Sequence, residues 1–277
     1  MPRFDVVHLW LHGDAKSDQA AAKSLKKTRV RNVIIRYAQP WRTNRDWPRR
    51  GLLRIEVKRT AAALSCSTSL SSLWLDRRTA NALALQRVRL PSSLKTVEVD
   101  ARGRLPLSAM PVGLKRLSVH WSQLFFDKRE PCFPCLETLV ICLCPGNTAH
   151  TSPKEHQTDQ ARWLCGWLGR VAPALIDLRV LTQVSVRGKC RSAHFLADVA
   201  MPSRNQQDLS NVARLTLVGI GGYHWSAWCW LVRSCFRVRT IDVTVPSNFV
   251  EEARADFQQL MTTTQGVTVT IIGSEEL

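Results

Sequence analysis

One spacing of apolar residues, apolar-x-x-apolar-x-apolar, recurs ten times along almost the whole chain. The ten copies begin at Val6, Val30, Leu52, Leu70, Leu94, Leu114, Leu136, Leu175, Val212 and Val238. Seven of the nine steps between these residues are 18 to 26 residues long, and the other two are 39 and 37. Repeats of this length are typical of a solenoid, in which each repeat packs only against its neighbours.

Within each copy, the second and third apolar positions alternate as in a short strand with one buried face. The first position lies where the chain bends towards the core. A last alternating run, Val267, Val269 and Ile271, adds a strand at the C-terminal end. We therefore predict an α/β fold in which residues 1–277 form a single solenoid. Its concave face is a parallel sheet of about 10 or 11 short strands, and its convex face is a mixture of loops and helices.

The spacing resembles the leucine-rich-repeat consensus L-x-x-L-x-L-x-x-N/C-x-L. Cys144 falls on the Asn/Cys position of that consensus, whereas the other copies hold different residues there. The segments Leu90–Lys95 and Met110–Lys115 also resemble the Pro-led repeats of protist and bacterial-effector proteins. The resemblance implies an irregular leucine-rich-repeat protein that works as a scaffold and not as an enzyme.

Two connecting segments carry clear helix signals. Ser152–Glu155 reads as a capping box with Pro at the first helical position. Asn248 with Glu251 starts a second helix that ends near Gly266, and we expect residues 245–277 to form a capping helix and strand. Connections in the first half of the chain are rich in Pro, Ser and Arg, so we predict turns, extended segments or short 3₁₀ pieces there.

Positive charge is concentrated near the N-terminus. The chain holds 39 Lys and Arg residues against 22 Asp and Glu, for a net charge of +17. The stretch from Lys26 to Arg59 alone has twelve basic and two acidic residues. Such a stretch favours an acidic partner or phosphates. We expect polyanion contact along a basic edge formed by Arg42, Arg45, Arg49, Arg50 and Arg59. A solvated face with Trp41 and Trp47 packed beneath it explains the pattern equally well.

Nine cysteines, irregularly spaced and mostly in apolar runs, favour reduced thiols over a disulfide framework. This is typical of the cytoplasm, the nucleus or an organelle matrix. Zinc prefers four converging thiolates, and the cysteines that could supply them are Cys132, Cys135, Cys142 and Cys144. Cys-x-Cys is an unusual half-site, so we favour free thiols over a zinc site.

No Gly-rich phosphate loop, His-Glu-x-x-His helix or Gly-x-Ser-x-Gly elbow occurs in the chain. The seven histidines share no motif, and we expect no catalytic site and no cofactor. No run approaches the roughly 18 apolar residues of a membrane span.

Large aromatic side chains at strand positions that point away from the core are candidate anchors for a partner. Trp10 and Trp74 lie between two buried positions of their repeats. The residues expected on the same partner-binding concave face are His8, Trp10, His12, Arg36, Arg54, Lys58, Trp74, Asp76, Arg116 and His120. Since this face also carries acidic residues, its charge is mixed.

Two functions fit these features. The first is a non-catalytic scaffold that recognises another protein, with acidic proteins among the candidates, through the concave face. The second is an RNA-associated structural subunit of a ribonucleoprotein or organellar complex, which uses the arginine-rich N-terminal third. A third hypothesis, a substrate-recruiting adaptor, rests on analogy with the family alone. We also expect the edge strand around Val6 to dock on another chain, because it has no preceding cap.

Overall fold

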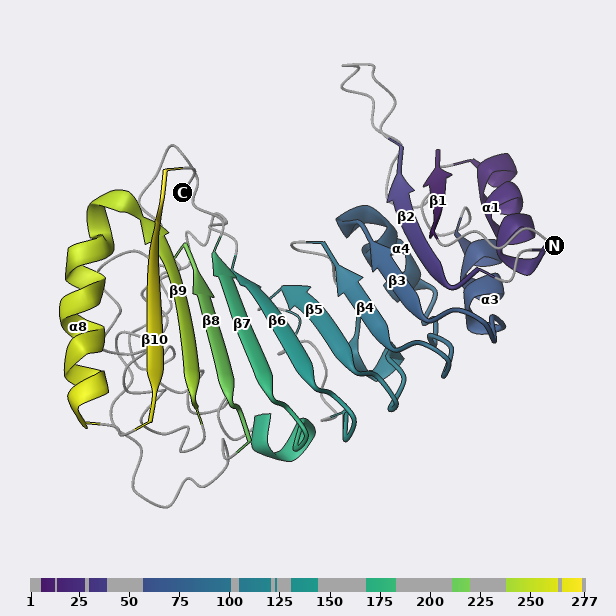
Figure 1. The fold of residues 1–277 in the computed structure, drawn as a ribbon. Coiled ribbons are helices and arrows are strands. Elements are labelled where there is room, and N and C mark those ends of the chain that lie inside the picture. The colour runs from purple at the N-terminus through teal and green to yellow at the C-terminus, as the bar shows by residue number, and fades with distance from the viewer. Residues whose placement is uncertain are drawn as a thin grey trace, which may run out of the picture. The chain divides into compact units, whose positions relative to one another are not determined.

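The computed structural model describes residues 6–12, 14–27, 30–38, 57–100, 105–120, 123, 131–143, 168–182, 211–219, 238–263 and 266–275. The chain forms two compact units, Met1–Phe133 and Pro134–Leu277. Among the described residues, each unit contains five parallel strands whose order in the sheet follows the chain (Figure 1). The predicted α/β fold with parallel strands is confirmed at this level, whereas the single domain over residues 1–277 stays a prediction.

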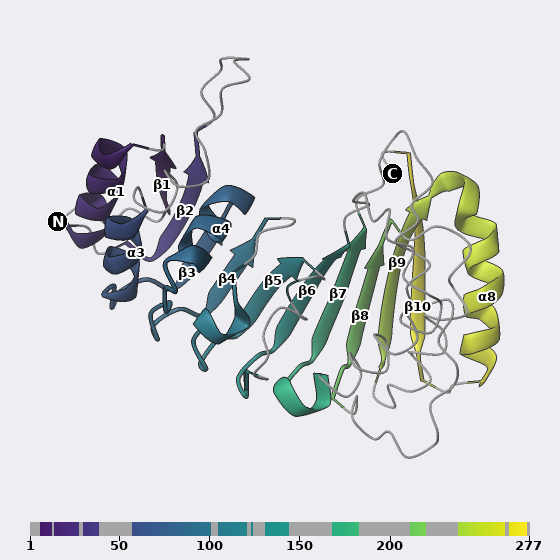
Figure 2. The same ribbon diagram turned by 180° about the vertical axis from the view of Figure 1, so that it is seen from behind.

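The first unit alternates strands with helices. Its strands are β1 (Val6–Leu11), β2 (Asn32–Tyr37), β3 (Ser72–Leu75), β4 (Thr96–Val99) and β5 (Arg116–His120). Its helices are α1 (Ala15–Lys27), α3 (Lys58–Ser65), α4 (Arg77–Leu85) and the 3₁₀ turn η1 (Leu107–Ala109). The three α-helices lie on one side of the strands. Figure 2 shows this arrangement from behind. We call the opposite side of β1 to β5 the open face.

The second unit has longer strands and ends in a helix followed by an edge strand. Its described strands are β6 (Thr138–Leu143), β7 (Asp177–Thr182), β8 (Arg214–Val218), β9 (Thr240–Pro246) and β10 (Thr268–Ser274). The 3₁₀ turn η5 (Ser247–Phe249) and the helix α8 (Val250–Thr263) join β9 to β10. None of the helices in the described part of the chain is long and apolar enough to cross a membrane.

Rows of aliphatic side chains form the core of each unit. In the first unit, register aligns Val33, Leu73, Val97 and Leu117 across β2 to β5, and all four are at most 1% exposed. In the second unit the corresponding row is Leu139, Leu178, Leu215 and Ile241. The first apolar positions from Val30 onward are also buried wherever the structure describes them. The recurring spacing therefore marks the buried side of the sheet, as predicted.

A repeated backbone arrangement fixes where successive strands begin. The carbonyl of the residue before a strand accepts two consecutive N–H groups from the next repeat. The Arg31 carbonyl accepts from Ser71 and Ser72 (2.7 and 2.9 Å), and the Lys95 carbonyl accepts from Lys115 and Arg116 (2.8 and 2.9 Å). In the second unit the carbonyls of Glu137, Ile176 and Ala213 accept N–H pairs in the same way. We call this arrangement the double-acceptor ladder.

The connections of the first unit are more helical than the sequence predicted. Alanines at Ala20–Ala22, Ala61–Ala63, Ala80 and Ala82 lie in α1, α3 and α4, and alanine has the highest helix propensity. The strand predicted around Val57 is also wrong. Val57 is the residue before α3, and β2 pairs directly with β3. Between β4 and β5 the described residues of the connection form turns and a 3₁₀ piece, as predicted.

The repeat alignment is wrong by two residues at β1. By spacing, Leu9 corresponds to Val33, but Leu9 is paired with Ile35. Val6, the first position of that copy, is 47% exposed, whereas the equivalent Val30 is 3% exposed. A shift of two keeps every side chain on its own face, so the burial pattern alone does not reveal it.

The predicted C-terminal helix and strand are confirmed as α8 and β10. Ala253 and Phe257 of α8 are fully buried, and β10 pairs in parallel with β9. Gly266 follows the helix with φ 80°, the left-handed conformation that favours glycine after a helix. The helix predicted after Ser152 lies outside the described residues.

Candidate recognition site on the first unit

Two tryptophans and an arginine lie together on the open face of the first unit. Trp10 of β1 is paired with Arg36 of β2, and Trp74 of β3 is paired with Ile34, two residues before Arg36. The Arg36 Cζ is 5.7 Å from the centroid of the Trp10 ring and 5.1 Å from that of Trp74. Both distances are within the range of cation–π interactions. We call these residues the Trp10–Arg36–Trp74 cluster.

The cluster depends on the register of β1. Had Leu9 been paired with Val33, Trp10 would be opposite Ile34, and Arg36 would lie beyond it. The observed pairing of Leu9 with Ile35 instead brings Trp10 beside Arg36. Because β2 lies between β1 and β3, the arginine receives one indole from each side.

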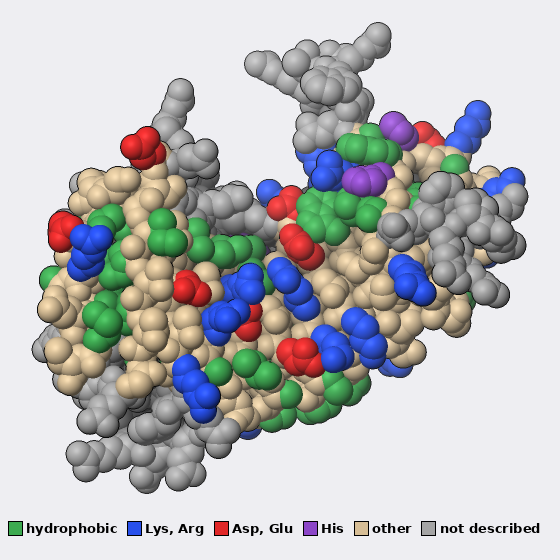
Figure 3. Space-filling view, in the orientation of Figure 1, with side chains coloured by type: hydrophobic (Ala, Val, Ile, Leu, Met, Phe, Trp, Pro, Cys, Tyr) green, Lys and Arg blue, Asp and Glu red, His purple; other side chains and the backbone are tan. Residues whose placement is uncertain are grey.

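The exposure of the cluster distinguishes it from the core. Trp10 is 49% exposed, and Arg36 is also exposed, whereas Leu9 and Leu11 beside Trp10 are buried. Trp74 is half-buried. Figure 3 shows hydrophobic side chains next to histidine and basic side chains over β1 to β3. A tryptophan that remains this exposed beside a cation is a typical anchor for a binding partner.

Other residues predicted for this face lie on or directly after β1 and β5. His8, on β1, is exposed and is paired with Ile34. His12 follows β1, and its backbone N–H donates to the Ser17 hydroxyl (3.1 Å). Arg116 is exposed on the open face, but β4 separates its strand from β3. His120 ends β5, and its N–H donates to the side chain of Gln123 (3.1 Å).

Two residues predicted on the strand face lie elsewhere. Lys58 is the first residue of α3, because the chain enters a helix where a strand was predicted. Asp76 follows β3 and caps α4, since its carboxylate accepts a hydrogen bond from the Thr79 N–H (2.7 Å). The same carboxylate accepts from the Tyr37 N–H. Asp76 therefore holds β2, β3 and α4 together, and its two oxygens are occupied.

Most of the predicted basic edge lies outside the described residues. Arg42, Arg45, Arg49, Arg50 and Arg54 lie outside the described residues, as do Trp41 and Trp47. Arg59 is in α3, where its backbone N–H donates to Asp18 (3.0 Å). The sequence analysis did not single out Arg31, Lys95 and Lys115, which are exposed at the positions preceding β2, β4 and β5. The Pro-x-x-Leu-Lys pattern before β4 and β5 was the sequence signal for Lys95 and Lys115.

The docking of the β1 edge on another chain stays a prediction.

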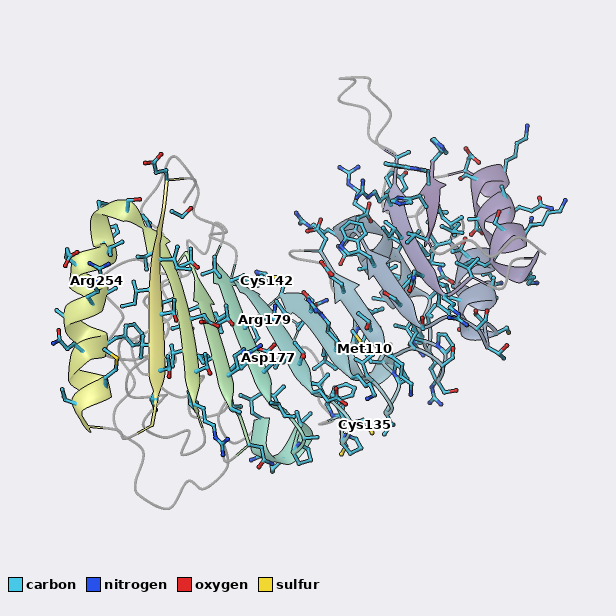
Figure 4. The ribbon with its side chains drawn as sticks, in the orientation of Figure 1. Met110, Cys135, Cys142, Asp177, Arg179 and Arg254 are labelled. Carbon is cyan, nitrogen blue, oxygen red and sulfur yellow. The ribbon has the colours of Figure 1, made fainter. Side chains whose placement is uncertain are left out.

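Of the described cysteines named as zinc ligands, Cys132 and Cys135 precede β6 and Cys142 lies within it. Cys135 precedes this strand and is exposed, whereas Cys142 lies near its end and is half-buried (Figure 4). The strand residues from Thr138 to Cys142 alone extend about 13 Å, at about 3.3 Å per residue. Thiolates that share a zinc ion each lie about 2.3 Å from it, so Cys135 and Cys142 do not share one. Cys144 lies outside the described residues, and no group of three or more metal-binding side chains occurs among the described ones.

The strand surface of the second unit carries a paired arginine. The Arg179 guanidinium donates to the Asp177 carboxylate through Nε (2.9 Å) and Nη2 (2.7 Å) (Figure 4). These hydrogen bonds raise the pKa of Arg179, and the nearby charge of Asp242 acts in the same direction. This surface is mixed in charge, as predicted, and Arg179 is paired with an acidic residue of the chain.

A scan against models of known protein families finds no match for this chain. A search of curated proteins finds no match either.

Proposed function

We propose that this chain is a non-catalytic recognition scaffold of the leucine-rich-repeat type, and that it binds another protein through the Trp10–Arg36–Trp74 cluster. The observation that carries the proposal is a half-exposed tryptophan held against an arginine on an otherwise regular strand face. Indole rings and a guanidinium supply contact area and hydrogen bonds, but they do not exchange protons near neutral pH. These groups suit binding better than catalysis.

The arrangement also lowers the entropy cost of binding. Each ring packs against Arg36, so the three side chains are held before a partner arrives. Side chains that are already ordered lose less freedom in a complex. The strands beneath them are fixed by parallel pairing and by the buried aliphatic rows. The cluster is therefore formed on paired strands before a partner arrives.

Affinity capture from native extract tests this function. The wild-type chain is compared with a Trp10→Ala, Trp74→Ala double variant, with and without nuclease, and each captured protein is then bound to the purified chain. We expect the double variant to lose the partner under both conditions. Leu85→Ala, at an apolar residue of α4 with similar exposure (51%), serves as the control. Direct binding of equal strength by the double variant and the wild type would refute the proposal.

The alternative function, an RNA-associated subunit, is favoured by the net charge of +17 and its concentration between Lys26 and Arg59. Phosphate contacts release counterions, so RNA affinity falls steeply as salt rises. Titration of a labelled oligouridylate at increasing salt measures this effect. Tight binding with a steep salt dependence that survives the double tryptophan substitution would support this alternative over the scaffold.

We also place the protein in a reducing compartment. The thiols of Cys66, Cys132 and Cys135 are free and exposed, which suits such a setting.

A further inference from the structure

Arg36 lies on β2 and Arg179 lies on β7, and these two arginines differ in their hydrogen bonds. Arg179, in the second unit, donates two N–H groups to Asp177. Arg36, in the first unit, contacts the rings of Trp10 and Trp74, and no carboxylate or carbonyl is paired with it in the part of the chain that the structure describes. Arg36 is a charged group whose hydrogen-bond donors are not used within these residues.

The acidic residue that follows the neighbouring strand does not supply the missing partner. Asp76 comes directly after β3, next to the end of β2. Its two oxygens accept the N–H groups of Tyr37 and Thr79 instead. A guanidinium presents its N–H groups in its own plane, at its edge. The contacts with the indoles use none of these N–H groups in hydrogen bonds to described residues, so the donors are open to an acceptor from outside.

We propose that Arg36 binds a side-chain or terminal carboxylate of an acidic protein segment, while Trp10 and Trp74 pack against the apolar groups next to it. This inference rests on the proposed function and names the chemistry of its ligand. A guanidinium matches a carboxylate through two parallel hydrogen bonds, which give both strength and a fixed orientation. Charge complementarity between the strongly basic chain and an acidic segment adds to the rate of association.

A neighbouring residue argues for a protein segment over a nucleic acid. Glu98, exposed on β4, is paired with Trp74 on the side away from Arg36. A polynucleotide presents a phosphate at every step and requires a basic stripe, so a carboxylate beside the stacking ring opposes it. A protein segment carries its charges singly. It can place a carboxylate at Arg36 and an amide or a cation near Glu98.

Fluorescence anisotropy with three probes tests the inference. The probes are a labelled peptide with a single Glu between Leu residues, the same peptide with Gln in place of Glu, and an oligouridylate. We expect the wild-type chain to bind the Glu peptide more tightly than the other two. Arg36→Lys keeps the charge but loses the planar pair of donors, and should weaken the Glu peptide about tenfold. Arg36→Ala should weaken it more, by about a hundredfold.

The matched control is Arg214→Ala, which removes an exposed arginine from the strand surface of the second unit. It should bind the Glu peptide as the wild type does, and thermal unfolding should show that all variants are folded. Equal affinity for the Glu and Gln peptides, or unchanged binding by Arg36→Lys, would overturn the inference. Tighter binding of the oligouridylate than of the Glu peptide would also overturn it.

The two proposals fail in different ways. If a captured partner is lost on substitution of the tryptophans but kept in Arg36→Lys, the cluster is a recognition site and only the carboxylate chemistry is wrong. If the partner binds equally well to the double tryptophan variant, the proposed function itself is wrong.

Discussion

The carboxylate of Asp18 in α1 accepts hydrogen bonds from the backbone N–H of Thr60 (2.9 Å) and from its hydroxyl (2.6 Å), 42 residues further along the chain. Thr60 lies in the first turn of α3, and the residue before that helix, Val57, supplies no capping side chain. Asp18 also accepts the N–H of Arg59 (3.0 Å). One helix thus caps another, and both partners are buried.

Replacing Asp18 with alanine should destabilise the first unit by about 1 to 3 kcal/mol. The buried N–H groups of α3 would lose their acceptor, and an unsatisfied buried donor costs more than an exposed one. Urea unfolding monitored by circular dichroism measures the change. Gln19→Ala, at an exposed neighbour in the same helix, is the control. Equal unfolding midpoints for the two variants would contradict the prediction.

The start of α1 should weaken in acid. The Ser17 backbone N–H donates to an Asp14 oxygen (2.6 Å), and this hydrogen bond lowers the pKa of Asp14 from its ordinary value of 3.8. A carboxyl group with a lowered pKa in the folded state stabilises the fold above its unfolded pKa. That stabilisation is lost as the pH falls through the folded pKa. We therefore expect the loss only below about pH 4.

Nuclear magnetic resonance of the Asp14 carboxyl carbon checks this pH dependence. The titration midpoint should lie below 3.8 in the folded protein and return to about 3.8 in urea. A folded midpoint at or above the unfolded one would show that the hydrogen bond from Ser17 does not persist in solution.

Proline at Lys95 should be far more damaging than alanine there. The Lys95 N–H donates to the Ser71 carbonyl (2.8 Å) as part of the double-acceptor ladder, and proline has no such donor. We expect Lys95→Pro to destabilise the first unit by about 3 kcal/mol or more, and Lys95→Ala to change its stability by less than about 0.5 kcal/mol. Thermal unfolding compares them. Similar losses in both variants would mean that the lysine side chain, and not the peptide group, fixes the strand.

Gly273→Val should loosen the last strand. A Cβ at Gly273 would lie 3.0 Å from Val250 Cγ2, which is tighter than most Cβ contacts, and in ordinary contact with Ser247 Oγ at 3.4 Å. Overpacking of this kind costs about 1 to 3 kcal/mol. Hydrogen exchange should then rise in β10 and α8. Thr270→Val places the same side chain at an exposed position of β10 and should leave exchange unchanged.

The parts of the fold that depend on alternation could be predicted from the sequence. Leu73 and Leu75, or Leu215 and Leu217, differ from their neighbours because one face of their strand is buried. That contrast is local, and it is visible in the sequence. The C-terminal helix was predictable for a related reason, since Asn248, Glu251 and Gly266 mark its ends.

The features that were missed depend on contacts far apart in the chain. Val57 fits the repeat spacing, but it is a buried residue directly before α3. A buried residue at the start of a helix and one at the end of a strand give the same apolar pattern in the sequence. Trp10 and Trp74 were predicted as anchors, and Arg36 as a neighbour on the same face. That Arg36 contacts the Trp10 ring as well as the Trp74 ring follows from the register of β1, which nothing near Trp10 in the sequence specifies.

Because of the double-acceptor ladder, the alignment of neighbouring strands does not depend on the number of residues in a repeat. The step from Leu94 to Leu114 is 20 residues and that from Leu136 to Leu175 is 39, yet the same pair of backbone hydrogen bonds joins the two ends of each step. The tied positions hold Arg, Ser, Lys, Glu, Ile and Ala without distinction. Evolution can therefore lengthen a connection or exchange these residues and leave every strand in place. Divergence of the sequence in such a protein need not imply divergence of its architecture.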